Sequence, residues 1–131
     1  MSGEDGGVLI GAEVLLLEDD ALINLNSTDM IEQMGCRVRS YMSVEDGFAA
    51  AQEQLPHVAV LDINIRGRLS YDLADWLRER DVPIVFVTGY DSPAIDGHWR
   101  EVPVCRKPCA PSSLRELLEA ALIRRGSRGP S

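Results

Sequence analysis

Five side chains that could share one chemical site each stand at the end of a short apolar run. Glu18 and Asp19 follow VLLL, Asp62 closes HVAVLD, Thr88 follows IVFV, and Lys107 follows VPVCR. Grouped carboxylates repel one another unless a cation lies between them, and an oxygen-only ligand set is typical of Mg²⁺. A hydroxyl and an ammonium group nearby could bind the remaining oxygens of a small anion. The combination indicates phosphoryl transfer, in which Asp62 attacks in line while Mg²⁺ and Lys107 neutralise the developing charge.

Each of these features also has an ordinary structural explanation. The acidic triplet at 18–20 could be a charge cluster at a helix amino terminus, where the macrodipole favours carboxylates. Asp62 alone could be a capping or loop residue, and Thr88 and Lys107 could belong to turns, since glycine and proline follow them. The arrangement argues for function, because acid pair, single acid, hydroxyl and lysine each fall at the end of a different predicted strand.

Alternating strand and helix patterns provide a way to bring these distant side chains together. Strands are predicted at 13–17, 36–41, 57–62, 84–87 and 102–106, and helices at 21–34, 43–55, 70–80, 92–99 and 111–125. This alternation is typical of an α/β fold, here a doubly wound five-stranded parallel sheet with five helices. The carboxyl ends of parallel strands lie along one edge of the sheet, where all the candidate side chains could meet.

The apolar content of the strands predicts their places in the sheet. The strand at 57–62 should be central, because its apolar run does not alternate and would be buried on both faces. The strand at 36–41 should lie at an edge, since Arg37 and Arg39 share one face. Residues 63–69 are predicted to be a loop.

The helices carry three further expectations. Ser43 offers a hydroxyl cap with an acid three residues on, and Ser70 is a second capping candidate. The first helix should present a broad apolar face to the sheet, made of Leu22, Leu25, Met30, Ile31 and Met34.

Length, charge and cysteine count limit the class of protein. The 131 residues suit one domain at 12–124, with a flexible amino-terminal segment at 1–11 and a flexible tail at 125–131. The formal net charge of −8 argues against nucleic-acid or anionic-membrane surfaces, which would repel the chain. The longest apolar stretch is far shorter than the roughly 20 residues that span a bilayer. Three cysteines and an amino terminus without a secretory pattern predict free thiols in the cytoplasm.

Four motifs, LLLEDD, VAVLDINI, VFVTGY and CRKP, occur in this order over residues 14–122. In order and spacing they resemble the receiver domain of bacterial two-component response regulators, which has a flavodoxin-like fold. The resemblance implies that Glu18 and Asp19 are the acidic pair that binds Mg²⁺, and that Asp62 is the phosphoacceptor and a further metal ligand.

The same resemblance assigns the remaining positions of the site. The backbone carbonyl of Asn64 matches another metal ligand, while Thr88 and Lys107 match the residues that contact the phosphoryl group. In this family the bond corresponding to Lys107–Pro108 is commonly cis.

One position departs from the family pattern. Receiver domains usually carry Tyr or Phe three residues before the lysine, and Val104 stands there. The segment PIVFVTGYD instead resembles the single-domain subfamily known by its FATGUY motif, with Val87 in place of the alanine and Tyr90 as the aromatic residue. One hypothesis is that Tyr90 shares switching with Thr88 or shields the acyl phosphate from water. The other is that Tyr90 is a loop aromatic that covers core.

The resemblance implies a stand-alone response regulator that takes a phosphoryl group from a histidine kinase or phosphotransfer protein. It would act through a downstream protein partner, or relay or drain phosphate, and would be no enzyme towards a separate substrate. Two other functions stay open: a phosphate-independent docking module, and a small phosphohydrolase with an aspartyl nucleophile. An Mg²⁺-dependent spectral change with a phosphate mimic would argue against the first. Turnover of a phosphate ester would be needed for the second, because Asn64 stands where such an enzyme needs its acid.

Overall fold

The computed structural model of this chain describes residues 7–89 and 102–128. In this part the strands are β1 (Glu13–Leu17), β2 (Arg37–Tyr41), β3 (Val58–Asp62), β4 (Asn64–Ile65), β5 (Arg68–Leu69), β6 (Ile84–Thr88) and β7 (Val104–Arg106). The helices are α2 (Ala21–Gln33), α3 (Val44–Glu53), α4 (Tyr71–Arg78) and α5 (Pro111–Arg128). The main sheet is parallel throughout and has the order β2-β1-β3-β6-β7. The predicted α/β fold with a five-stranded parallel sheet is therefore confirmed.

Strand β3 lies in the middle of this sheet, between β1 and β6. All of its residues are buried, including Asp62 at its carboxyl end. Strand β2 is an outer strand, and Arg37 is exposed on it. Both positions agree with the sequence, because an uninterrupted apolar run needs cover on two faces and a mixed run does not.

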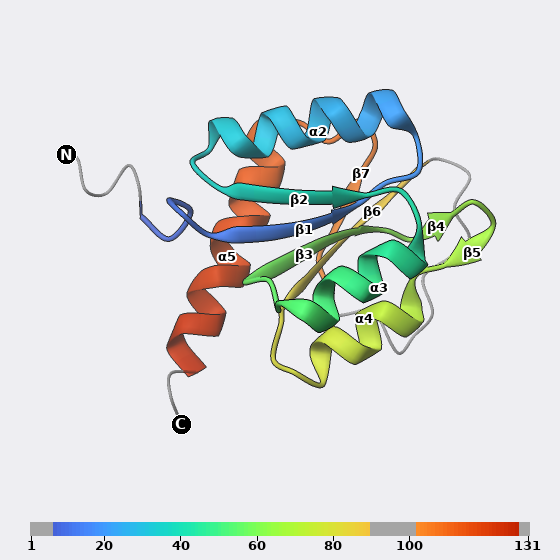
Figure 1. Cartoon of the computed structure of the whole chain (residues 1–131). Helices are drawn as coiled ribbons and strands as arrows, with labels where there is room; N and C mark the ends of the chain where they lie inside the picture. Colours follow the sequence, from blue (N-terminus) through green and yellow to red (C-terminus); the bar gives the residue numbers. More distant parts are fainter. Residues whose placement is uncertain (1–6, 90–101, 129–131) are drawn as a thin grey trace.

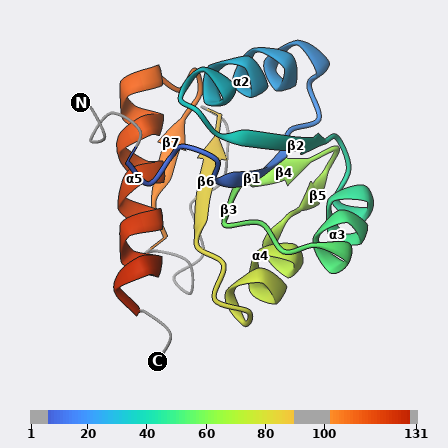
Figure 2. The ribbon, with the colours of Figure 1, turned by 60° about the vertical axis from the view of Figure 1, so that its left-hand side comes forward.

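The helices cover the sheet in two pairs (Figures 1 and 2). On one face, α3 and α4 pack on a buried cluster that contains Leu61 and Phe86, and Leu73 and Leu77 of α4 complete it. The second cluster lies under α2 and α5 on the other face, where Ile31 and Leu118 are fully buried. Side chains of β3 point alternately into the two clusters, so both halves of the core support the strand that carries Asp62.

The buried face of α2 differs from the predicted one. Ile31 and Met34 are buried as expected, but Leu22 and Leu25 are 66% and 65% exposed. Asn24 takes their place, and its side-chain amide donates to the backbone carbonyls of Glu18 at 3.0 Å and Tyr41 at 3.4 Å. These two hydrogen bonds orient α2 about its axis with Asn24 towards the sheet, because the backbone carbonyls at the ends of β1 and β2 need donors.

Residues 63–69 were expected to form a loop, and this expectation is wrong. They contain the antiparallel pair β4 and β5, in which Asn64 is opposite Leu69 and Ile65 is opposite Arg68. The turn between them has positive φ at Arg66 (54°) and Gly67 (83°). Strands of two residues are too short to show a period in a sequence, which explains the error.

The two predicted serine caps have different outcomes. The Ser43 hydroxyl accepts a hydrogen bond from the Asp46 amide at 3.1 Å and caps α3 as expected. Ser70 occupies the cap position of α4 but makes no side-chain cap bond. Its buried hydroxyl donates instead to the backbone carbonyl of Asp62 at 2.7 Å. The side chain of Ser70 therefore stabilises the end of β3 rather than the start of α4.

Both predicted terminal segments contain residues that continue the fold. Within the predicted flexible segment at 1–11, Leu9 is buried and belongs to the cluster under α2 and α5. Helix α5 continues to Arg128, three residues beyond its expected end. Strand β7 starts at Val104, and the helix expected at 92–99 lies outside the described residues. Within the described ranges, no helix combines the length and hydropathy needed to cross a membrane.

Candidate functional site

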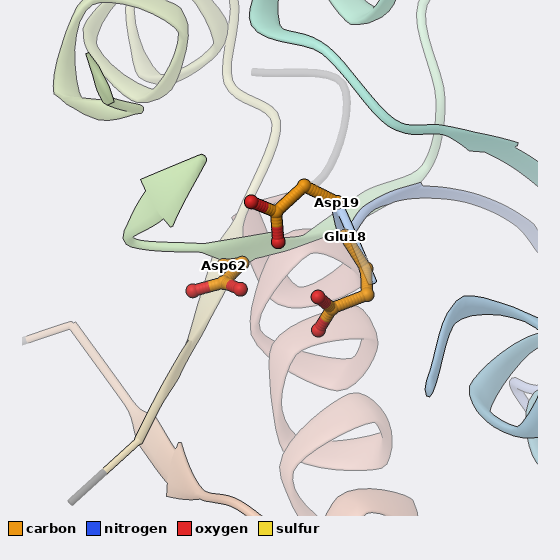
Figure 3. Close-up of side chains that lie close together, drawn as sticks. All are labelled: Glu18, Asp19 and Asp62. Carbon is orange, nitrogen blue, oxygen red and sulfur yellow. The ribbon is translucent and has the colours of Figure 1, made fainter. Parts of the chain in front are cut away.

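Three carboxylates meet at the carboxyl ends of β1 and β3 (Figure 3). Glu18 and Asp19 follow β1, Asp62 ends β3, and one oxygen from each of the three lies within 4.8 Å of the others. Glu18 is 3% and Asp62 is 5% exposed. Parallel pairing of β1 with β3 places these residues side by side although 43 positions separate Asp19 from Asp62 in the chain.

Lys107 brings a positive charge into the same cluster. Its Nζ lies 2.7 Å from Oε1 of Glu18 and 2.7 Å from Oδ2 of Asp62. The Lys107 backbone amide donates to the carbonyl of Thr88 at 2.8 Å, so the end of β6 positions the lysine. The Lys107–Pro108 bond is cis, as the resemblance implies.

Backbone amides hold each of the three carboxylates. Oε2 of Glu18 accepts from the amide of Asp20 at 3.0 Å, and Oδ1 of Asp62 accepts from the amide of Asn64 at 3.3 Å. Oδ2 of Asp19 accepts from the amide of Arg66 at 2.8 Å. Such bonds fix the carboxylate planes while leaving lone pairs free for another ligand.

The charges of the cluster do not balance within the described residues. Three carboxylates against one ammonium leave a formal net charge of −2. Burial raises the pKa of Glu18, and bonds from Lys107 and the Asp20 amide only partly oppose this effect. For Lys107, burial lowers the pKa, but the bonds to Asp62 and Glu18 outweigh burial, and the pKa is raised overall. The cluster therefore favours the binding of additional positive charge.

The donor set fits Mg²⁺. Oxygens around an octahedral Mg²⁺ lie roughly 3–4 Å apart, because each metal–oxygen distance is about 2.1 Å. The separations of up to 4.8 Å here need only small side-chain rotations to reach that range. Glu18, Asp19 and Asp62 would hold the ion, and the ligand atoms that they offer are all oxygens, which suits magnesium better than zinc.

Asn64 and Thr88, which were also predicted to belong to the site, make no side-chain hydrogen bond to the three carboxylates among the described residues. Asn64 is two residues beyond Asp62. The hydrogen bond from its backbone amide to the Asp62 side chain keeps this part of the backbone beside the cluster. Thr88 is buried at the same edge of the sheet, but its hydroxyl donates to the carbonyl of Gly89 at 3.4 Å rather than to a carboxylate. Tyr90 lies outside the described residues.

The sequence interpretation missed the contributions of Ser70 and Arg66. Ser70 was read as a helix cap, and its bond to the Asp62 carbonyl depends on the hairpin that brings residue 70 back to the strand end. Arg66 contributes through its backbone amide, which every residue except proline possesses, so no side-chain signal could have identified it.

The raised pKa of Glu18 predicts how metal affinity depends on pH. Only the deprotonated carboxylate binds a metal, so Mg²⁺ affinity should fall as the pH drops through a value above the ordinary 4.5 of glutamate. Calorimetric Mg²⁺ titrations between about pH 8 and pH 4 would measure this midpoint. A midpoint at or below 4.5 would contradict the burial of Glu18 as the controlling effect.

Comparison with known proteins shows the family of the chain. A family model described as the response regulator receiver domain matches residues 14–119. The transcriptional regulatory protein AfsQ1 of Streptomyces coelicolor is 33% identical over 76 residues, which are 57% of this chain and 34% of AfsQ1. The chain thus spans about a third of the length of that curated relative.

Solved structures show the same fold. SdrG from Sphingomonas melonis Fr1 superposes with a TM-score of 0.76 at 31% identity, over 88% of this chain and 98% of that one. The receiver (REC) domain of the PhyR response regulator from Erythrobacter litoralis superposes with a TM-score of 0.77 at 24% identity, over 89% and 94%. From the family match over residues 14–119, we conclude that this chain belongs to the response regulator receiver domain family.

Proposed function

We propose that Asp62 accepts a phosphoryl group from a phosphohistidine of a histidine kinase or phosphotransfer protein. The observation that carries this proposal is the 2.7 Å contact between Lys107 Nζ and Asp62 Oδ2, beside the carboxylates of Glu18 and Asp19. A buried carboxylate next to a fixed cation and a candidate metal site suits a nucleophile that attacks phosphorus. Glu18, Asp19, Asp62 and the backbone carbonyl of Asn64 would hold Mg²⁺.

The transfer forms one bond and breaks one. An Asp62 carboxylate oxygen bonds to phosphorus as the phosphorus–nitrogen bond of the phosphohistidine breaks. The imidazole nitrogen keeps the electron pair and takes up a proton. Bound Mg²⁺ would supply positive charge for the phosphoryl oxygens. Lys107 would move its ammonium group from the carboxylate to a phosphoryl oxygen, where the Thr88 hydroxyl would donate a second contact.

An exposed apolar surface beside the site supports a protein as the phosphodonor. Leu22, Ile23 and Leu25 are exposed in the first turns of α2, immediately after the acidic residues. Ile23 also lines a cavity of about 520 Å³, together with Glu18, Lys107 and mostly apolar neighbours. Apolar patches of this kind are typical of protein interfaces rather than of sites for small phosphates.

The proposed output is a change in protein contacts. New bonds from Thr88 and Lys107 to the phosphoryl group would favour one state of a pre-existing equilibrium, and Tyr90 would share this switching. We propose a stand-alone cytoplasmic role, in which the phosphorylated chain binds a downstream protein, or relays or drains phosphate.

Phosphorylation by a small donor tests this function. Incubation with acetyl phosphate and Mg²⁺ should produce a retarded band in a phosphate-sensitive gel, and removal of Mg²⁺ with a chelator should abolish it. Beryllofluoride with Mg²⁺ should change the fluorescence of the chain. If neither the gel nor the spectrum responds, the proposal is wrong and the phosphate-independent docking module is the alternative to test.

A further inference from the structure

The β4–β5 hairpin lies next to the carboxylate cluster, beyond the carboxyl end of β3 (Figures 1 and 3). Its turn reaches back to the end of β1, because the amide of Arg66 donates to Oδ2 of Asp19 at 2.8 Å. This bond joins residues 47 positions apart and links the hairpin to a carboxylate that follows β1. Asp19 is thereby held by a different element from the one that carries it.

The conformation of Arg66 is unusual for its residue type. Its φ of 54° lies in the left-handed region, which costs free energy for residues with a Cβ and is usually left to glycine or asparagine. Gly67 next to it has a φ of 83°. Strained backbone of this kind persists only where surrounding contacts impose it, and such positions cluster at functional sites.

Contacts on both sides impose the shape of this turn. The side-chain carbonyl of Asn64 accepts from the amide of Gly67 at 2.9 Å across the turn. On the outer side, the Arg68 guanidinium pairs with Glu45 of α3. The Arg66 side chain itself is exposed, and no ion pair is found for it among the described residues. The backbone of Arg66, not its guanidinium, is therefore the part that the structure uses.

We propose that Arg66 is a positioning residue for metal binding, because its left-handed backbone aims an N–H group at Asp19 and fixes the orientation of that carboxylate. The inference rests on the proposed function, since it assigns Asp19 as an Mg²⁺ ligand. Hydrogen bonds from outer groups to ligating carboxylates typically change metal affinity 10- to 100-fold. The hairpin would supply this bond from a separate part of the chain, so the shape of its turn would set the affinity for the ion.

Three variants separate the amide from the side chain. Arg66→Ala removes the guanidinium and keeps the N–H, and Arg66→Gly does the same and also relieves the strain. Arg66→Pro removes the N–H and, because proline locks φ at about −65°, also the left-handed backbone that aims this group at Asp19. Calorimetric titration with Mg²⁺ should give affinities close to wild type for Arg66→Ala and Arg66→Gly. For Arg66→Pro, the affinity should fall by about 10- to 100-fold. Equal affinities for the proline and alanine variants would overturn the inference.

A measurement on the wild-type chain tests the inference even if the proline variant does not fold. Amide hydrogen exchange, followed by nuclear magnetic resonance without metal, should show slow exchange at Arg66 although the residue is exposed. Exchange at the rate of a free amide would contradict the bond to Asp19. The two proposals can fail independently. If the wild-type chain takes up phosphate but Arg66→Pro binds Mg²⁺ as tightly as the wild type, only the positioning role of Arg66 is wrong. Absence of uptake by wild type removes the proposed function.

Discussion

Replacing Asp62 with asparagine should reduce phosphoryl uptake to background, a loss of at least about a thousandfold. A carboxamide has nearly the size of a carboxylate but is not a nucleophile towards phosphorus. Asp62 is buried among the residues of β3, and its side chain contacts Lys107 and the Asn64 amide, so asparagine can occupy the same space. Labelling from a phosphorylated kinase and from acetyl phosphate would measure the loss.

An exposed aspartate provides the matched control. Asp72→Asn on α4 removes the same charge from the chain but lies outside the carboxylate cluster, and it should leave uptake unchanged. Circular dichroism should give the same spectrum for both variants. Retention of label by Asp62→Asn would show that another residue accepts the phosphoryl group.

Loss of the lysine charge should have the largest effect on stability. Lys107→Met keeps most of the side-chain length but leaves Glu18 and Asp62 facing each other without their shared cation. Breaking a buried ion pair by removing one partner costs about 3–5 kcal/mol, and these carboxylates are almost completely buried. Without Mg²⁺, the free energy of unfolding of Lys107→Met should fall by about 3 kcal/mol, as measured by urea denaturation.

Two conditions should restore much of this stability. Mg²⁺ would neutralise the carboxylates, and an ion at 100 times its dissociation constant contributes about 2.7 kcal/mol. A lower pH would also help, because the pKa of Glu18, already raised by burial, would rise further without the lysine. The loss of stability in Lys107→Met is therefore largest above the pKa of Glu18 and declines as the pH falls through that pKa.

A surface ion pair gives the comparison for this effect. Arg115 and Glu119 lie 3.8 Å apart on α5, and both side chains are more than 40% exposed. Arg115→Met should cost less than about 1 kcal/mol, because solvent screens such pairs. Similar losses for Arg115→Met and Lys107→Met would contradict the assignment of Lys107 as the counter-ion of a buried cluster.

The sequence was most informative where burial leaves a strong pattern. An unbroken apolar run ending in Asp62 correctly predicted the central strand, and Arg37 with Arg39 correctly predicted an edge strand. The pattern failed for α2, where Leu22 and Leu25 are exposed and Asn24 is buried. Apolar periodicity cannot foresee that a polar side chain satisfies two strand-end carbonyls and so rotates the helix.

The candidate site was predictable to the extent that it is made of strand ends. The parallel sheet brings Glu18, Asp19, Asp62 and Lys107 together, as their positions after apolar runs suggested. The amide of Arg66 was not predictable, because it depends on a left-handed turn in a short hairpin. Side-chain types reveal which groups can react, whereas backbone groups that orient them become visible only in the structure.

Chemical mapping of the phosphorylated residue tests the central claim most directly. Borohydride reduces an aspartyl phosphate to homoserine, so the chain phosphorylated with Mg²⁺ would be reduced, digested and sequenced by mass spectrometry. We predict homoserine at position 62, in the peptide that contains HVAVLDINI. Homoserine at another aspartate, or a phosphoryl group that survives on a serine, threonine or histidine, would contradict the assignment of Asp62 as the phosphoacceptor.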